Sequence, residues 1–295
     1  MIIANHEQLT EAVIATMERT PDPRLREIMT SLATHLHAFV RETRLTEREW
    51  EKAISSVVRL GQLTNDTHNE AVLMAGSLGL SQLICLLNNG DNGQSETAAN
   101  LLGPFWRMHS PVTANGGSLL RSPTPGPALF VNAVVIDKHG APVAGAEVDV
   151  WHSSTVGLYE QQDPQQADMN LRGKFTTDEQ GRFWFRSVKP AGYPLPVDGV
   201  VGELLKAQNR QHYRPAHLHT LIYKPGMKTL ISQIYVNDDP LLEVDPQFGV
   251  TRRLVGDFVR HDEPGPEGVE APWYSLDYRF VMEEGETRLP RPPIK

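Results

Sequence analysis

The chain changes character near residue 100, and this change constrains its fold more than any other feature. Before that point apolar residues recur at helical spacing, which predicts helices at residues 7–19, 24–43, 46–62 and 67–89. Beyond it, 20 of the 22 prolines separate short segments rich in β-branched and aromatic residues. No long helical pattern alternates with these segments, so a parallel α/β sheet is disfavoured. We expect a mainly β protein with α, in which a C-terminal β-sandwich follows an N-terminal helical region.

The second part of the sequence predicts short strands and few helices. Lys174–Thr177 and Phe183–Phe185 are expected to form a hairpin, with Gly181 at its left-handed position. One or two helical turns are expected at Leu204–Asn209. We therefore expect the chain to divide into a helical linker region at residues 1–100 and a β-sandwich domain at residues 101–295. The main strands are expected at residues 129–136, 147–151, 182–187, 217–223, 229–236 and 275–282.

Composition excludes several classes of protein. The net charge of −8 leaves no basic stripe for nucleic acid or an anionic membrane surface. Cys85 is the only cysteine and lies in an apolar run, which indicates an inert buried thiol and a reducing cytoplasm. The N-terminus lacks the basic and apolar regions of a signal peptide. Residues 71–87 carry no charge, but polar and small residues there favour a core or interface helix over a membrane span.

Two histidines lie two residues apart in a predicted strand. Side chains at such positions share one face, so His217 and His219 can bind one metal ion together while Leu218 points into packing. No carboxylate follows closely, which argues against a cupin site. The pair alone leaves zinc open, with His152 or His212 as a third ligand and hydrolysis as the reaction.

Two tyrosines lie in loops rich in proline and glycine. Tyr159 follows Gly157, and Tyr193 follows Gly192, so each side chain is placed by a loop instead of by periodic packing. Phenolate is a hard anionic ligand that suits a hard trivalent ion. The alternative is that both tyrosines only pack, in a sandwich-type module that binds carbohydrate or a transported ligand.

Several segments taken together resemble the intradiol ring-cleavage dioxygenases. The spacings of Tyr159, Tyr193 and His217 match the pattern of that family. Further similarity covers most of the chain, at residues 101–106 (LLGPFW), 140–146, 148–152, 169–173 and 213–219.

The resemblance implies an iron site and a mechanism. Tyr193 resembles the tyrosine that leaves the metal and accepts a proton from the substrate. Arg214 matches an arginine that steadies negative charge on the ring carbon attacked by O2, and Gln233 matches a glutamine near the iron. O2 is inserted between the hydroxyl-bearing carbons, and a cyclic anhydride is hydrolysed to a diacid. The implied Fe(III) ligands are Tyr159, Tyr193, His217 and His219.

The family resemblance also implies partners and a substrate class. The helices before residue 100 would form a linker region that builds a homodimer and can bury a lipid. Residues 167–173 and 201–205 are most similar to hydroxyquinol 1,2-dioxygenases, which convert benzene-1,2,4-triol to maleylacetate in aromatic catabolism. The alternative is a catechol 1,2-dioxygenase that forms cis,cis-muconates.

One position departs from the hydroxyquinol pattern. Those enzymes can carry an aspartate in the pocket helix where this chain has Gly76, and Gln247 is the candidate to compensate. A third hydroxyl in an apolar pocket needs a hydrogen-bond partner. The expected pocket residues are Leu73, Gly76, Leu101, Leu195, Arg214 and Gln247.

Overall fold

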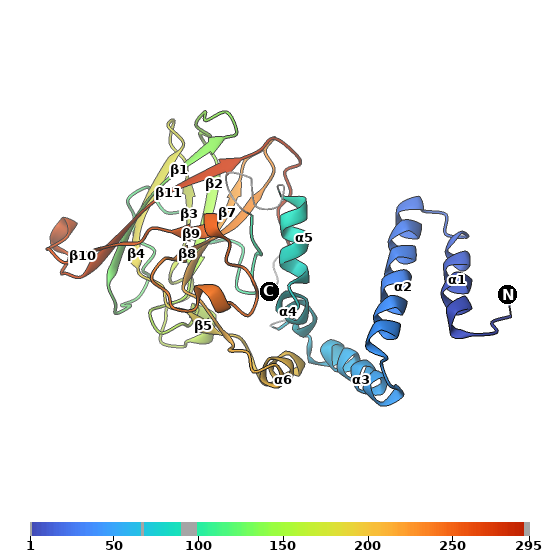
Figure 1. Ribbon diagram of the computed structural model, residues 1–295. Coiled ribbons are helices and arrows are strands. Elements are labelled where there is room, and N and C mark those ends of the chain that lie inside the picture. Colours follow the sequence, from blue (N-terminus) through green and yellow to red (C-terminus); the bar gives the residue numbers. More distant parts are fainter. Residues whose placement is uncertain (1, 66–67, 90–98, 292–295) are drawn as a thin grey trace. The chain divides into compact units, whose positions relative to one another are not determined.

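The computed structural model describes residues 2–65, 68–89 and 99–291. It contains two compact units, Met1–Arg59 and Leu60–Lys295. Helices form the first unit and sheets dominate the second, which confirms the mainly β fold with α (Figure 1). In the sequence, the boundary between the two units falls within helix α3 (Glu47–Leu63), whereas the change from helices to strands occurs after residue 88.

The helices of the first unit lie where the sequence predicts them. They are α1 (His6–Met17), α2 (Pro23–Thr43) and α3, and α1 packs against α2. Thr46 and Glu49 form the predicted capping box at the start of α3. The backbone N–H of Thr46 donates to Glu49 Oε2 over 2.9 Å, and that of Glu49 donates to Thr46 Oγ1 over 3.3 Å.

The single helix predicted at 67–89 is wrong. Residue 67 lies outside the described residues, and the rest forms two helices, α4 (Glu70–Ser77) and α5 (Leu80–Asn88). Gly79 separates them with a φ of +74°, a left-handed conformation that ends a helix. Of the helices described, none alone is long and apolar enough to cross a membrane. Only this pair, bent by 75°, reaches that length and apolarity together.

Helix α5 has one buried and one exposed apolar side. Cys85 packs into the core, and burial raises the pKa of its thiol, as expected for an inert cysteine. On the exposed side, Leu80, Leu83, Ile84 and Leu87 are each more than half exposed, from 51% to 67%. An exposed apolar surface of this kind is typical of an interaction face.

In the described part of the chain, the second unit is built on two facing sheets (Figure 1). One has the strand order β10-β11-β1-β4 and the other β3-β2-β7-β8-β9, while β5 and β6 form a ribbon. Both sheets are mixed, because β1 pairs in parallel with β11 and β8 with β9. The strands are β1 (Ala128–Asp137), β2 (Glu147–His152), β3 (Arg172–Thr176), β4 (Arg182–Val188), β5 (Tyr193–Pro194), β6 (Tyr213–Arg214), β7 (His217–Tyr223), β8 (Leu230–Val236), β9 (Val255–Gly256), β10 (Val259–His261) and β11 (Trp273–Met282).

The predicted hairpin between β3 and β4 is also wrong. Strand β3 pairs with β2 and β4 pairs with β1, so the turn between them crosses from one sheet to the other. Gly181 does adopt the predicted left-handed φ, at +72°, and a Cβ there would lie 2.3 Å from the carbonyl oxygen of Val135. The turn therefore packs directly on β1. The helical turns expected at 204–209 are part of a longer helix, α6 (Val200–Ala207).

The apolar core lies between the two sheets. Alternate residues of β1 from Leu129 to Val135 are at most 5% exposed and point inward. Phe183 lies 6.0 Å from Phe175 and 6.1 Å from Phe280 between ring centroids, so aromatic rings from both sheets meet in the centre. This packing holds the five-stranded sheet in place and leaves its outer face free for other roles.

Replacing Phe183 by alanine should destabilise the protein strongly. The ring is 1% exposed, and losing a buried phenylalanine costs about 3–5 kcal/mol in the free energy of unfolding. Urea unfolding followed by circular dichroism measures this loss. Trp184→Ala is the matched control, because Trp184 is the next residue on β4, is 38% exposed and should cost less than half as much. Equal losses would contradict the assignment of the core face.

Candidate metal centre

Strand β7 places both histidines on the outer face of the five-stranded sheet. His217 and His219 are fully buried there, and Leu218 between them points into the sandwich core, as predicted. In the register with β8, His219 lies opposite Gln233 and His217 opposite Tyr235. Residues opposite each other on neighbouring strands share a face, so four polar side chains form one patch.

Tyr159 and Tyr193 reach this patch because glycines allow their loops to pack closely. A Cβ on Gly157 would lie 2.4 Å from the carbonyl oxygen of Gly192. A Cβ on Gly192 would lie 2.4 Å from the carbonyl oxygen of Arg214. Tyr193 also pairs directly with Arg214 in the β5–β6 ribbon. The glycines before each tyrosine therefore allow backbone contacts that any side chain would block.

The four predicted ligands converge. Ring centroids are 5.4 Å apart for Tyr159 and Tyr193, 5.4 Å for Tyr193 and His217, and 6.3 Å for Tyr159 and His219. The Nε2 atoms of the two histidines are 3.1 Å apart. Each of the four side chains is 3% exposed or less. The structure thus brings two phenols and two imidazoles together in one buried place.

The proton states of these groups suit metal binding. Nδ1 of His217 lies 2.7 Å from the carbonyl oxygen of Pro215, to which it donates, so Nε2 keeps a free lone pair. Burial and the charge of Arg214 lower the pKa of His217 to about 3. Burial and His217 hold the pKa of His219 well below its usual value. Both imidazoles are therefore neutral and able to act as ligands.

Tyr159 shows why the donor set fits a trivalent cation. Its hydroxyl is buried and has no hydrogen-bond partner among the described residues. Burial and the neighbouring Tyr193 raise the pKa of Tyr159 well above its usual value, so a strong positive charge is needed to remove the proton. A hard ion such as Fe(III) supplies that charge and would satisfy the unpaired oxygen.

The zinc alternative lacks a third ligand. Both ring nitrogens of His152 are engaged, Nδ1 with the Ser153 carbonyl oxygen at 2.7 Å and Nε2 with Ser187 Oγ at 2.6 Å. Across residues 2–65, 68–89 and 99–291, no group of three or more His, Cys, Asp or Glu side chains is placed to hold a metal. A set of His152, His217 and His219 is therefore not formed.

The loop at residues 101–106 covers the patch, as the family resemblance implies. Phe105 stacks on Tyr159 with ring centroids 4.3 Å apart. Gly103 has a φ of +76°, and a Cβ there would lie 2.9 Å from Cε1 of His219. Glycine at this position lets the backbone lie against the imidazole. The loop thereby excludes water from the two residues it covers.

A buried ion pair holds the segment that carries Tyr159. Arg172 Nε donates to Glu160 Oε1 over 2.7 Å, with both side chains 2% exposed or less. Arg107 Nη1 donates to the same oxygen over 2.9 Å, and the backbone N–H of Tyr159 donates to Gln162 Oε1 over 3.0 Å. The Arg172 guanidinium also lies 6.0 Å from the Tyr159 ring. These contacts fix Tyr159 and place a cation beside it.

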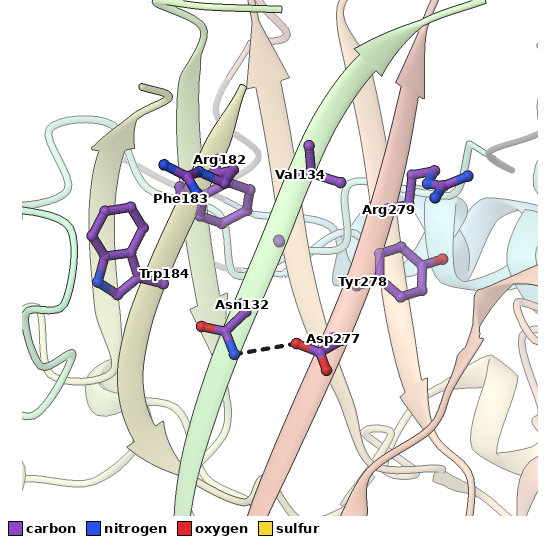
Figure 2. A pocket seen from close by; sticks show the side chains of 9 residues that line it. Asn132, Val134, Arg182, Phe183, Trp184, Asp277, Tyr278 and Arg279 are labelled. Atoms are coloured by element: carbon purple, nitrogen blue, oxygen red, sulfur yellow. Dashed lines mark hydrogen bonds between the residues drawn. The ribbon is translucent and has the colours of Figure 1, made fainter. Parts of the chain in front are cut away.

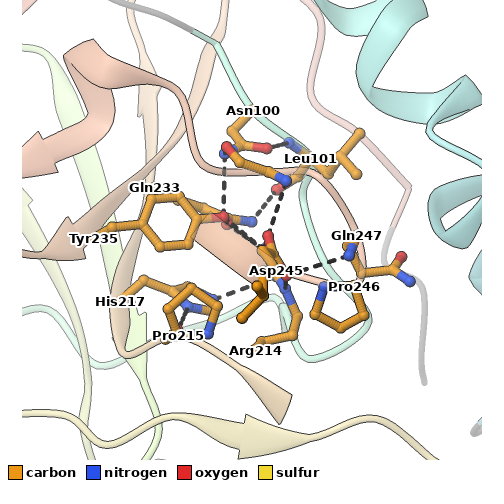
Figure 3. Close-up of polar contacts among 12 residues, drawn as sticks. Asn100, Leu101, Arg214, Pro215, His217, Gln233, Tyr235, Asp245, Pro246 and Gln247 are labelled. Carbon is orange, nitrogen blue, oxygen red and sulfur yellow. Dashed lines mark hydrogen bonds and ion pairs between the residues drawn. The ribbon is translucent and has the colours of Figure 1, made fainter. Parts of the chain in front are cut away.

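Arg214 is held at the edge of the patch by several partners (Figure 3). Its Nε and Nη2 donate to the two carboxylate oxygens of Asp245 over 3.2 and 3.1 Å. Nη2 also donates to Gln233 Oε1 over 3.1 Å and to the Tyr235 hydroxyl over 2.5 Å. Nη1 lies 3.4 Å from the Tyr193 hydroxyl. Arg214 is 4% exposed, so it is a fixed buried cation and not part of a surface salt bridge.

Sequence reasoning missed Tyr235 and Asp245. Tyr235 lies two residues after Gln233 on β8, so the alternation that placed His217 and His219 on one face could have found it. Asp245 lies in a loop, where no periodic signal exists. Only the folded arrangement shows that it pairs with the site arginine.

Four of the remaining predicted pocket residues form two pairs, each with one member on helix α4. Leu73 packs in one apolar cluster with Leu195. The Gln247 amide lies against Gly76, where a Cβ would be 1.8 Å from Gln247 Oε1. Leu101 packs against the sandwich core. The structure thus pairs Leu73 with Leu195 and Gly76 with Gln247.

A separate hollow of about 940 Å³ lies on the outer face of the other sheet (Figure 2). Strands β1, β4 and β11 form its floor, and Asn132 Nδ2 donates to Asp277 Oδ1 over 3.1 Å. None of the predicted site residues lines it. The hollow is therefore not part of the candidate metal centre.

Comparisons with known proteins agree with this arrangement. Residues 102–282 match the family model described as "Dioxygenase", and residues 22–96 match "Catechol dioxygenase N terminus". Hydroxyquinol 1,2-dioxygenase of Rhizobium sp. (strain MTP-10005) is 40% identical over 282 residues, or 94% of this chain and 95% of that protein. Catechol 1,2-dioxygenase of Candida albicans is 35% identical over 278 residues, or 94% and 92%.

Solved structures show the same fold. Hydroxyquinol 1,2-dioxygenase from Pseudomonas putida DLL-E4 superposes with a TM-score of 0.86 at 35% identity, covering 95% of this chain and 99% of that one. The fold and the sequence matches together define a dioxygenase. The chain belongs to the intradiol ring-cleavage dioxygenase family.

Removing the carboxylate partner of Arg214 should destabilise the protein. Asp245→Asn leaves a buried cation without its counter-charge, which costs about 3 kcal/mol in the free energy of unfolding. Asp238→Asn is the control, because Asp238 pairs with Lys189 at 2.7 Å but its side chain is 55% exposed. That change should cost less than about 1 kcal/mol. Similar losses in urea unfolding would show that Arg214 does not depend on Asp245.

The difference between wild type and Asp245→Asn should also depend on pH. Burial alone would raise the pKa of Asp245, but the charge of Arg214 and several hydrogen bonds lower it below its ordinary value. The stabilisation that ionised Asp245 provides is therefore fully present above the pKa of an aspartate in the unfolded chain, about 3.9. It is lost as pH falls through the lower pKa of Asp245 in the folded protein. Unfolding curves at pH 7 and pH 5 should give the same difference, and the difference should shrink only below about pH 4.

Proposed function

We propose that this dioxygenase opens a 1,2-dihydroxybenzene between its two hydroxyl-bearing carbons and inserts both atoms of O2. The observation that carries this proposal is the meeting of two phenols and two imidazoles in one buried place, where the Tyr159 hydroxyl has no hydrogen-bond partner within the described part of the chain. Bound Fe(III) would supply the Lewis acidity that ionises the diol and activates its ring toward O2. The proposed ligands are Tyr159, Tyr193, His217 and His219.

The protein groups around this centre have separate roles in the proposal. Tyr193 accepts a proton from the substrate, and Nη1 of Arg214 lies 3.4 Å from its hydroxyl. Arg214 also holds the negative charge that develops on the ring before it reacts with O2. Gln233 keeps the guanidinium in place by accepting from Nη2. Because Asp245 fixes the same guanidinium, the cation needs no rearrangement during the reaction.

The proposed substrate is hydroxyquinol, benzene-1,2,4-triol, and the product is maleylacetate. Support comes from the relatives at 35–40% identity that carry the name hydroxyquinol 1,2-dioxygenase. Catechol, giving cis,cis-muconate, is the second candidate, because the Candida albicans relative is a catechol 1,2-dioxygenase. The two substrates differ by one ring hydroxyl, so the choice depends on how the pocket accommodates that group.

We further propose that residues 1–100 act as a dimerisation region for a catalytic domain at residues 101–295. Helix α2 carries an exposed apolar stripe, and α5 carries another on the side away from the core. A homodimer would cover such surfaces, with or without a bound lipid. The lone buried cysteine is consistent with a cytoplasmic protein. The stripe on α2 consists of Leu25, Ile28, Leu32, Leu36 and Phe39, which are 46–53% exposed.

Removing the phenol oxygens tests the ligand assignment. Tyr159→Phe and Tyr193→Phe should each lower iron content and change the visible colour, because one anionic donor is lost. Tyr278→Phe is the control, since Tyr278 lies on β11 and donates to the Arg253 carbonyl oxygen, away from the patch. Iron is measured by plasma mass spectrometry alongside the absorption spectrum. Full iron and unchanged colour in both site variants would refute the assignment.

Oxygen uptake tests the substrate assignment. Iron-replete protein is compared on hydroxyquinol and catechol at equal concentration, with products identified by mass spectrometry. We expect uptake on both and a higher rate on hydroxyquinol. A higher rate on catechol would overturn the hydroxyquinol assignment, and no uptake on either would overturn the intradiol reaction.

A further inference from the structure

The two histidines of the candidate metal centre are held in different ways. His217 donates from Nδ1 to the carbonyl oxygen of Pro215 over 2.7 Å, and this hydrogen bond fixes its ring. Nδ1 of His219 is buried and has no hydrogen-bond partner in the described part of the chain. A histidine that binds a metal normally has its second nitrogen fixed by such a bond. Within that part of the chain, a contact of another kind must orient His219.

The neighbouring strand β8 has no free amide for this nitrogen. Gln233 lies opposite His219 on β8. Its Nε2 donates to the carbonyl oxygen of Leu101 over 2.8 Å, while its Oε1 accepts from Arg214 Nη2 over 3.1 Å and from the Tyr235 hydroxyl. Both ends of the amide are therefore engaged in holding the covering loop and the site arginine.

The strand on the other side of β7 supplies an aromatic ring instead. Trp151 on β2 lies opposite His219, and residues opposite each other on neighbouring strands share a face. The two ring centroids are 4.8 Å apart and the ring planes differ by 7°, so the indole and the imidazole are stacked almost in parallel. Both side chains are at most 1% exposed. The register between β2 and β7 therefore sets this stack.

Two further contacts restrict the stack. Arg172 lies opposite Trp151 on β3, and its Nε donates to Glu160 Oε1 over 2.7 Å, so the strand beyond the indole is fixed as well. A Cβ on Gly103 would lie 2.9 Å from Cε1 of His219, so the backbone of the covering loop packs against the imidazole. Close packing of this kind leaves the ring of His219 little room to rotate.

The stack fixes the plane of the imidazole and with it the direction of its ligand atom. Nε2 of His219 lies 3.1 Å from Nε2 of His217, so this edge of the ring faces the centre. The ring can turn over only through an orientation perpendicular to the indole, and Trp151 stands in the way of that movement. The indole thus performs for His219 what a hydrogen bond performs for His217.

We propose that Trp151 is a positioning residue for the metal centre, whose indole sets the plane of His219 and keeps Nε2 directed at the iron. This inference rests on the proposed ligand set and adds to it a residue that does not touch the metal. The role requires an aromatic face and not only an apolar side chain of sufficient size. Without that face the imidazole can tilt away from the centre, and iron binding weakens.

The test measures Fe(III) affinity, by competition with a chelator, in variants at position 151. Trp151→Leu keeps an apolar side chain but removes the aromatic face, whereas Trp151→Phe keeps a ring that can stack. We expect Trp151→Leu to bind iron about tenfold more weakly than wild type and to shift the visible absorption band, because an orienting contact around the metal is lost. Trp151→Phe should stay within about threefold of wild type. Trp151→Met, whose flexible side chain fills irregular space, is read in the same way if Trp151→Leu does not fold.

Two control variants separate positioning from packing. Trp273→Leu removes another stacked tryptophan, whose ring centroid lies 3.9 Å from that of His261 on the other sheet. Phe183→Leu shrinks a ring that is 1% exposed in the sandwich core. Its iron-free form should lose thermal stability by an amount comparable to that of Trp151→Leu, so it shows what a loss of stability alone does to iron binding. Neither control should change the affinity for iron by more than about twofold.

The outcomes distinguish the inference from the ligand set on which it rests, with His219→Ala as the reference for loss of the ligand itself. If His219→Ala loses iron but Trp151→Leu keeps wild-type affinity and absorption, the indole does not position the ligand, although the metal centre stands. If His219→Ala also keeps its iron, the proposed ligand set fails and the inference fails with it. Weaker binding in Trp151→Leu that Trp151→Phe restores supports the inference. Equal losses in Trp151→Phe or in Phe183→Leu would overturn it.

Discussion

The pairing of β7 between β2 and β8 is the constraint on which the site depends. Each strand alternates its side chains, so the register that buries Leu218 in the core also sets His217 and His219 on the opposite face. The same register brings Gln233 and Tyr235 beside them. If β7 slipped by one residue against its neighbours, the side chains that face the core and those that face the site would change places. Folding of the sandwich and assembly of the histidine face of the candidate metal centre are therefore one event.

Charge around the patch is balanced in pairs. Arg214 is matched by Asp245 and Arg172 by Glu160, with all four side chains 5% exposed or less. Each pair holds one of the two tyrosine-bearing segments. A buried ion pair adds little net stability, because desolvation opposes the attraction. Its value here is positional, since each guanidinium is fixed beside a tyrosine of the candidate metal centre.

Part of this arrangement could be predicted from local patterns, whereas the meeting of the two tyrosines with the two histidines was implied by the family resemblance alone. The spacing of His217 and His219 placed them on one face, and glycines marked the two tyrosine loops. The failures have physical causes. Asp178 to Gly181 has the turn chemistry of a hairpin, but the same chemistry serves a corner between sheets. Gly79 breaks a helix whose apolar pattern continues across it. Asp245 belongs to a loop, and its pairing with Arg214 depends on the folded chain alone.

The parallel pairing of β1 with β11 has a consequence for how the protein is made on the ribosome. Leu129 lies opposite Tyr274, and the register continues to Asp137 opposite Met282. Until the last strand leaves the exit tunnel, β1 has an open edge and the phenylalanine core lacks Phe280. A contact between residues so distant in the sequence forms slowly. The nascent chain therefore exposes an unpaired strand edge from the emergence of β1 until β11 follows it, and chaperones protect such edges during synthesis.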